Sequence, residues 1–104
     1  MAVTMTGFCG YARLDDPALM EEGERGTAEL CLRAAVDHAR GADIPVEKLE
    51  AADNAKYELY IYAIANHFYD NRAFLSLTQS FAGDEYTKRV MTAMRIELES
   101  EGWL

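Results

Sequence analysis

Two histidines are the side chains in this sequence best suited to acid–base or metal chemistry. His67 precedes Asp70 by three residues, so the two fall on one turn of a helix. A zinc site needs at least three protein ligands, and this pair supplies two. We therefore interpret His67 as an aromatic packing residue with one hydrogen-bonded nitrogen. His38 falls in the last turn of a predicted helix, where the helix dipole favours a cation, so we assign it a capping or core role.

Other reactive side chains also have simpler explanations. Glu21, Glu22 and Glu24 could recruit a divalent cation, but acidic residues also stabilise a helix N-terminus, and we interpret them as a solvated helix start. Cys9 and Cys31 lack CxxC spacing and nearby histidine pairs, which predicts free, buried thiols. The sequence has no Gly-rich phosphate loop, no Gly-x-Ser-x-Gly and no Ser/His/Asp order. We therefore expect no catalytic residues, no metal, no cofactor and no enzymatic activity.

Composition predicts a single soluble domain over 1–104. The chain has 104 residues, half of them hydrophobic, and no run near the ~20 apolar residues that a membrane span needs. Its start lacks the basic and apolar regions of a secretory signal, so we expect a cytoplasmic protein without membrane contact. The net charge is −8, with no basic stripe. Sequence-specific binding of nucleic acid is therefore not expected.

The elements that position these side chains are predicted to be helices only. Gly7 and Gly10 weaken the first helical segment, and Gly23 and Gly26 soften the second, where a break near Thr27 is allowed. Period-2 alternation typical of strands is missing, so we predict a small all-α bundle of about four helices. The segments run over about 4–14, 17–40, 45–72 and 85–97, and the core of the domain over 4–96.

The central helix is unusually aromatic. Residues 57–72 hold five of the ten Tyr and Phe side chains, and apolar side chains cover most of the helix circumference. Such a helix must be covered on several sides, and a second subunit is the natural source of cover in so short a chain. The predicted core side chains, on one face of each helix, are Leu30, Ala34, Tyr57, Ile61, Ile64, Phe68, Met91 and Met94.

Aromatic side chains outside that core are candidates for a subunit interface. Tyr60, Tyr62 and Tyr69 fall off the apolar stripe, and Arg72 ends the same segment. Tyr and Arg are enriched in interface hot spots. Arg72 can pair with a carboxylate of its own subunit or across a subunit boundary, and the sequence leaves both open.

Three segments together resemble the tailed-phage head–tail connector family, also called head-completion or DNA-packaging adaptor proteins. Tyr-Ala-Arg-Leu-Asp-Asp at 11–16 is similar to the family's opening signature, although Ala12 stands where Leu is usual. Ala-Ile-Ala-Asn-His-Phe-Tyr-Asp-Asn-Arg at 63–72 resembles its hallmark, a helix ending in His-aromatic-Tyr-Glu-Asn-Arg. Val-Met-Thr-Ala-Met-Arg at 90–95 sits where the family has a short helix ending in Leu-x-x-Leu-Arg.

The resemblance implies a structural role in a virion or prophage. Such proteins form a ring under the portal, extend the DNA channel after packaging, and dock tail or stopper proteins. It implies self-association into a ring that matches the twelvefold portal, and a location at the head–tail junction, or in the bacterial cytoplasm during assembly. Acidic side chains would suit a channel through which DNA slides. The candidates are Asp15, Asp16, Glu21, Glu22, Glu24, Asp84 and Glu85.

Two other classes of protein stay open from the residues alone. A small acidic regulator, antitoxin-like or a DNA mimic, would also use an acidic surface and exposed aromatics to bind one partner protein. It should be a monomer or dimer in solution. A helical enzyme using His67 and nearby carboxylates would require bound metal in the purified protein.

Overall fold

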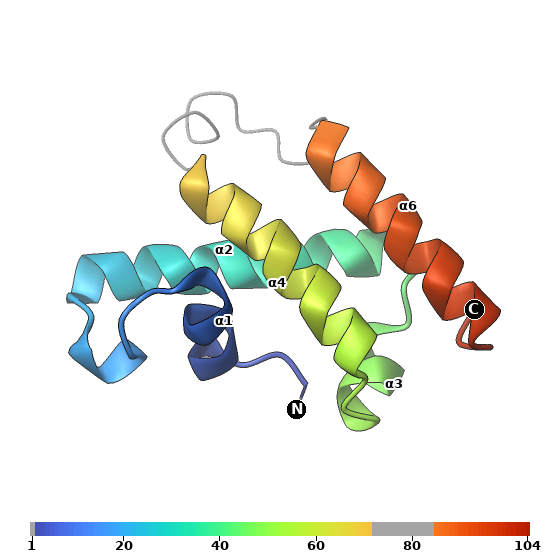
Figure 1. Ribbon diagram of the computed structural model, residues 1–104, viewed down its shortest axis with the longest axis horizontal. Helices are drawn as coiled ribbons and strands as arrows, with labels where there is room; N and C mark the ends of the chain where they lie inside the picture. The colour runs from blue at the N-terminus through green and yellow to red at the C-terminus, as the bar shows by residue number, and fades with distance from the viewer. Residues whose placement is uncertain (1, 72–84) are drawn as a thin grey trace.

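A computed structural model describes residues 2–71 and 85–104. Within these ranges the chain is helical and contains no strand, which confirms the predicted all-helical bundle. Figure 1 shows α4 crossing α2, with α6 alongside α4, α1 on the other side of α4, and α3 at the N-terminal end of α4. The elements are α1 (Met5–Ala12), a one-turn 3-10 helix η1 (Pro17–Leu19), α2 (Glu22–Gly41), α3 (Val46–Ala51), α4 (Ala55–Asp70) and α6 (Glu85–Ser100).

The long helix predicted over 45–72 is divided in two, so that prediction is wrong in this detail. α3 ends at Ala51, and Asp53 adopts a left-handed backbone with φ 50°, which a continuing helix does not allow. The Asn54 side chain then accepts a hydrogen bond from the Tyr57 amide at 2.9 Å. Asn54 is thus the N-cap of α4, because it satisfies one of the amides that lack a partner in the first turn.

The second predicted helix also begins later than expected. Asp16 accepts from the Ala18 amide at 2.9 Å and caps η1, which stops after one turn. α2 then starts at Glu22 and runs without a break past Thr27, whose hydroxyl donates to the Gly23 carbonyl at 3.1 Å. The break allowed near Thr27 is therefore wrong, and the chain bends before the glycines instead of at them.

The core lies where α4 meets α1, α2 and α6. Seven of the eight predicted core residues are buried or half-buried, and Tyr57, Ile61, Ile64 and Phe68 are completely inaccessible to solvent. Leu30 is the exception, with 54% of its surface exposed. It lies five positions before the buried Ala35, about 140° around the helix at 3.6 residues per turn, so it points away from α4.

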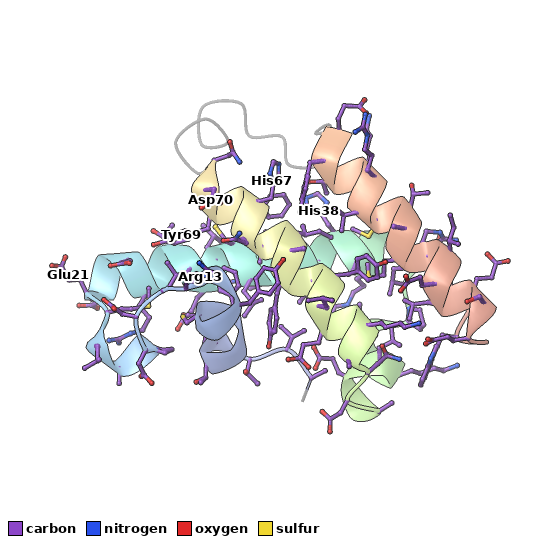
Figure 2. The ribbon with its side chains drawn as sticks, viewed as in Figure 1. Arg13, Glu21, His38, His67, Tyr69 and Asp70 are labelled. Carbon is purple, nitrogen blue, oxygen red and sulfur yellow. The ribbon has the colours of Figure 1, made fainter. Side chains whose placement is uncertain are left out.

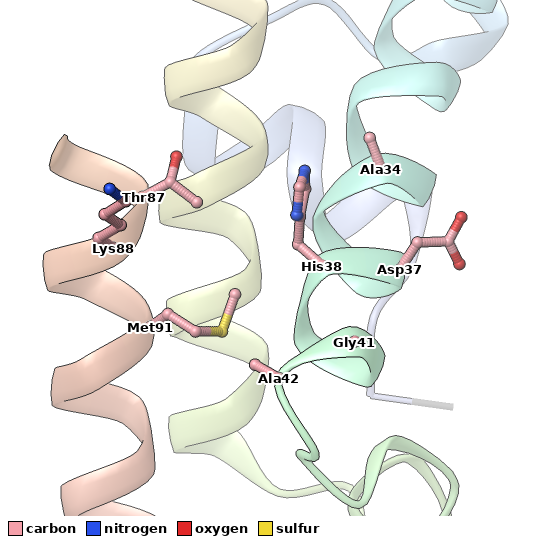
Figure 3. A pocket seen from close by; sticks show the side chains of 8 residues that line it. All are labelled: Ala34, Asp37, His38, Gly41, Ala42, Thr87, Lys88 and Met91. Atoms are coloured by element: carbon pink, nitrogen blue, oxygen red, sulfur yellow. The ribbon is translucent and has the colours of Figure 1, made fainter. Parts of the chain in front are cut away.

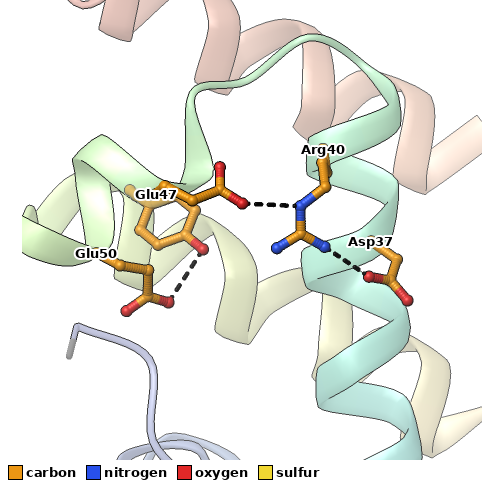
Figure 4. A network of polar contacts seen from close by, with 5 residues as sticks. Asp37, Arg40, Glu47 and Glu50 are labelled. Carbon is orange, nitrogen blue, oxygen red and sulfur yellow. Dashed lines mark hydrogen bonds and ion pairs between the residues drawn. The ribbon is translucent and has the colours of Figure 1, made fainter.

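The N-terminal segment is fastened to α3 through one carboxylate. Glu50 accepts hydrogen bonds from the Ala2 and Val3 amides, at 2.8 and 3.2 Å, and from the Tyr57 hydroxyl at 3.2 Å. Figure 4 shows Glu50 near the exposed ion pairs that Arg40 makes with Asp37 and Glu47. Burial, and then the nearby Glu50 charge, raise the pKa of the Tyr57 phenol.

Candidate interaction surfaces

Tyr62, predicted at a subunit boundary, lies inside the subunit. Only 4% of its surface is exposed. Its hydroxyl accepts from the Thr4 amide at 3.1 Å and donates to the Ala2 carbonyl at 3.4 Å. The Phe8 ring packs 6.2 Å from it, centroid to centroid. The prediction that Tyr62 is left over from the core is therefore wrong, because the N-terminal segment and α1 cover it.

Tyr69 is likewise enclosed, and Tyr60 is half-buried. Only 6% of the Tyr69 surface is exposed. Its hydroxyl donates to a Glu24 carboxylate oxygen at 3.2 Å. Figure 2 shows Tyr69 where α4 contacts α2. The prediction that Tyr69 lies outside the core is therefore also wrong. Burial, and then a hydrogen bond with Glu97 on α6, raise the pKa of Tyr60. Arg72 lies outside the described residues, so its pairing stays a prediction.

Other apolar side chains are exposed in their place. Leu19 on η1 is the most exposed of them, with 78% of its surface accessible. The predicted helix over 17–40 would continue through residue 19, whereas η1 stops after one turn and leaves Leu19 outside α2. Within residues 2–71 and 85–104, the exposed large hydrophobic residues are Tyr11, Leu19, Leu30, Leu59, Tyr86, Ile96 and Leu104.

The candidate channel acids do not gather on one surface. Four of them, Asp15, Asp16, Glu21 and Glu22, are exposed around Leu19, and we call residues 15–22 the Leu19 corner. Glu24 follows on α2 and accepts from Tyr69. Glu85 is exposed at the start of α6, away from that corner in Figure 1. Asp84 lies outside the described residues.

A groove of about 580 Å³ separates the C-terminal half of α2 from the N-terminal half of α6, and we call it the α2–α6 groove. His38 and Met91 extend into it from opposite sides, whereas the Asp37 carboxylate points away from α6 (Figure 3). The His38 ring packs 5.6 Å from that of Phe68. Burial lowers the pKa of His38, and the neighbouring Asp37 charge opposes this in part. The described residues that line the groove are Ala34, Asp37, His38, Gly41, Ala42, Thr87, Lys88 and Met91.

The side chains with potential for chemistry are packed separately. His67 stacks on Tyr86 with ring centroids 4.4 Å apart, as an aromatic packing residue. The buried Cys9 thiol lies 3.8 Å from the Met20 sulfur, and burial raises its pKa, which disfavours the reactive thiolate. Among residues 2–71 and 85–104, no three His, Cys, Asp or Glu side chains are grouped so as to hold a metal ion.

Comparisons with known proteins add no assignment. The chain matches no protein-family model, no curated protein and no solved structure. In the part of the chain that the structure describes, no helix is both long and apolar enough to span a bilayer.

Proposed function

We propose that this chain is a structural protein of a tailed phage or prophage, a head–tail connector that forms a ring under the portal. The observation that carries the proposal is the placement of the three segments that resemble that family. The first ends α1 and enters η1, the described part of the second forms the last turns of α4, and the third lies in α6. All three helices pack into one core around α4, with the Tyr11 and Tyr62 rings 6.0 Å apart.

The role requires surfaces and does not require catalysis. A ring subunit needs two patches that meet in its neighbours, one face for the portal and one for a tail or stopper protein. Exposed apolar side chains on η1, α2, α4 and α6 supply such surfaces. Tyr60 and Arg72 stay candidates for the subunit boundary, because Tyr60 keeps part of its surface accessible at the α4–α6 seam.

The charge of the chain supports passage of DNA without adhesion. The net charge is −8, and the ten basic side chains are scattered along the sequence. A protein that grips DNA neutralises several phosphates with clustered Lys and Arg. A ring of acidic subunits would repel the backbone of the DNA that it surrounds.

Deletion of the gene in the phage or prophage that encodes it tests the proposal. We expect DNA-filled heads that lack tails and lose their DNA, because the connector both seals the portal and provides the docking face. Purified wild-type protein added to those heads should restore tail attachment. If the deletion leaves normal tailed particles, the connector role is wrong. A monomer or dimer that binds one unrelated protein would then favour a small acidic regulator.

A further inference from the structure

The Leu19 corner presents its apolar side chain on a fixed turn. The Leu19 amide donates to the Asp16 carbonyl at 2.8 Å, which closes η1. The Arg25 guanidinium donates to the carbonyls of Pro17 and Met20, at 2.9 and 3.1 Å, and so holds both ends of the turn against α2. A backbone turn that is fixed before binding loses little conformational entropy when it docks.

The α2–α6 groove has the size and lining that such a side chain needs. Ala34, Ala42 and Met91 provide apolar surface. His38 adds an imidazole ring, whose burial favours the uncharged form. A volume of about 580 Å³ is more than one leucine side chain fills, so the groove has room for Leu19 and for part of the turn that carries it.

The two surfaces also offer charges of opposite sign. Residues 13–25 contain five acidic and two basic side chains, a net charge of −3, while the α6 side of the groove presents Lys88 and the Asp37 carboxylate on the α2 side points away from α6. Lys88 lines the groove and forms no ion pair with another described residue. Complementary charge steers association and fixes the register of a contact.

We propose that the α2–α6 groove receives the Leu19 corner of a second copy of this chain. The two surfaces lie toward opposite ends of α2, about 30 Å long at 1.5 Å per residue, as the positions of Glu21 and His38 in Figure 2 show. One copy therefore cannot fill its own groove, and the corner of each copy must enter the groove of another. The contact is head-to-tail, which generates a ring when the rotation closes.

The inference rests on the proposed function and deepens it, because this would be the lateral contact of the ring. It also changes the expected place of four acids. Asp15, Asp16, Glu21 and Glu22 lie at the subunit boundary in this arrangement, and not on the channel wall.

Disulfide trapping between two variants, each with one added cysteine, tests the contact directly. Leu19→Cys and Gly41→Cys place thiols on the two surfaces, and a Cβ at Gly41 meets no atom within 4 Å. Native Cys9 and Cys31 are buried and should not compete. Under mild oxidation the mixture should form a covalent dimer, whereas each variant alone should not. A chain with both substitutions should form a ladder of larger species.

The matched control replaces Gly41→Cys with Ile96→Cys, which is exposed on α6 but lies outside the groove. A mixture of Leu19→Cys with Ile96→Cys should give no dimer above background. If it cross-links as readily as the Gly41→Cys mixture, or if neither mixture cross-links, the proposed contact is wrong.

A pair of leucine variants measures what the corner contributes. Leu19→Ser should weaken self-association roughly tenfold or more in sedimentation equilibrium, because burying a leucine contributes about that much. Leu30→Ser removes a leucine that is also exposed, on the outer face of α2, and should leave association unchanged. Equal loss in the two variants would indicate non-specific hydrophobic association and overturn the assignment.

Charge exchange tests the register. Lys88→Glu alone, and Glu21→Lys with Glu22→Lys, should each weaken association by roughly two- to fivefold, as expected for exposed charge pairs. Combining all three changes should recover the loss. If the triple variant loses as much association affinity as the separate changes lose together, the two surfaces do not meet.

These results separate the contact from the wider role. Heads from the gene-deletion phage can be supplied with Leu19→Ser protein. If that protein restores tail attachment as well as wild type does, the contact is wrong and the connector role stands. If gene deletion leaves tails intact, the connector role is wrong, while the cross-linking result still reports how copies of the chain associate.

Discussion

At the scale of single residues, Glu50 is a side chain whose removal should lower the stability of the fold. Its carboxylate accepts from two N-terminal amides and from Tyr57. Glu50→Ala should lower the free energy of unfolding by about 2–3 kcal/mol, because three donors lose a charged acceptor at a partly buried site. Urea denaturation measures this loss.

Glu47→Ala is the matched control for that substitution. Glu47 lies on the same helix, but its Arg40 pair is exposed, and such pairs contribute little to stability. Equal midpoints for the two variants would show that the N-terminal segment is not fastened through Glu50.

His38 should make stability depend on pH. Burial lowers its pKa in the folded state, so the unfolded chain takes up the proton more readily. The stability that uncharged His38 contributes is fully present above the unfolded pKa of about 6.5 and is lost as the pH falls through the lower pKa of the folded state. His38→Gln should flatten the stability profile in this window, as measured by thermal unfolding in matched buffers.

Asp37→Asn provides the opposite change. Removing the charge that favours the imidazolium should lower the pKa of His38 further and steepen the loss of stability on acidification. A profile that His38→Gln leaves as steep as in wild type would contradict this account of the groove.

At the scale of elements, α1 contains two glycines whose surroundings leave different amounts of space for a side chain. A Cβ at Gly7 would overlap the Tyr62 hydroxyl and crowd its ring, whereas a Cβ at Gly10 would meet no atom within 4 Å. Gly7→Ala should cost about 1–3 kcal/mol, because the buried ring must move. Gly10→Ala should stabilise the chain by up to ~1 kcal/mol through helix propensity. Chemical denaturation of both variants compares them, and equal effects would mean that α1 does not approach Tyr62 closely.

The helices themselves could be predicted from the sequence because their buried faces repeat every 3.6 residues. The stripe of Tyr57, Ile61, Ile64 and Phe68 is buried as that period requires. The division at Ala52–Asn54 is not predicted by the apolar pattern, because that pattern continues in phase on either side, although Asp53-Asn54 is typical of a turn.

The fate of the remaining tyrosines could not be predicted in this way. Tyr62 is covered by Ala2 and Thr4, about 60 residues earlier, and Tyr69 by Glu24, 45 residues earlier. Such contacts depend on how helices cross, which no local period encodes. The same limit applies to Leu19, whose exposure follows from where η1 ends and α2 begins.

At the scale of the whole molecule, the charge distribution predicts weak interaction with DNA. A chain of net charge −8 without a basic stripe has few cations to place on phosphates. At low salt its affinity for duplex DNA should be weaker than ordinary non-specific binding, whose Kd is on the order of 10⁻⁴–10⁻⁶ M. Fluorescence anisotropy with a labelled duplex checks this. Micromolar binding that weakens steeply with salt would indicate a true nucleic-acid binder.

The connector role itself is tested most directly by electron cryo-microscopy of the portal vertex in particles from the phage or induced prophage that encodes the chain. We expect a closed ring of this all-helical subunit between portal and tail, with the Leu19 corner of each copy in the α2–α6 groove of the next. Its central opening should surround the DNA without density joining side chains to phosphates. Particles whose portal vertex is complete without this chain would contradict the account.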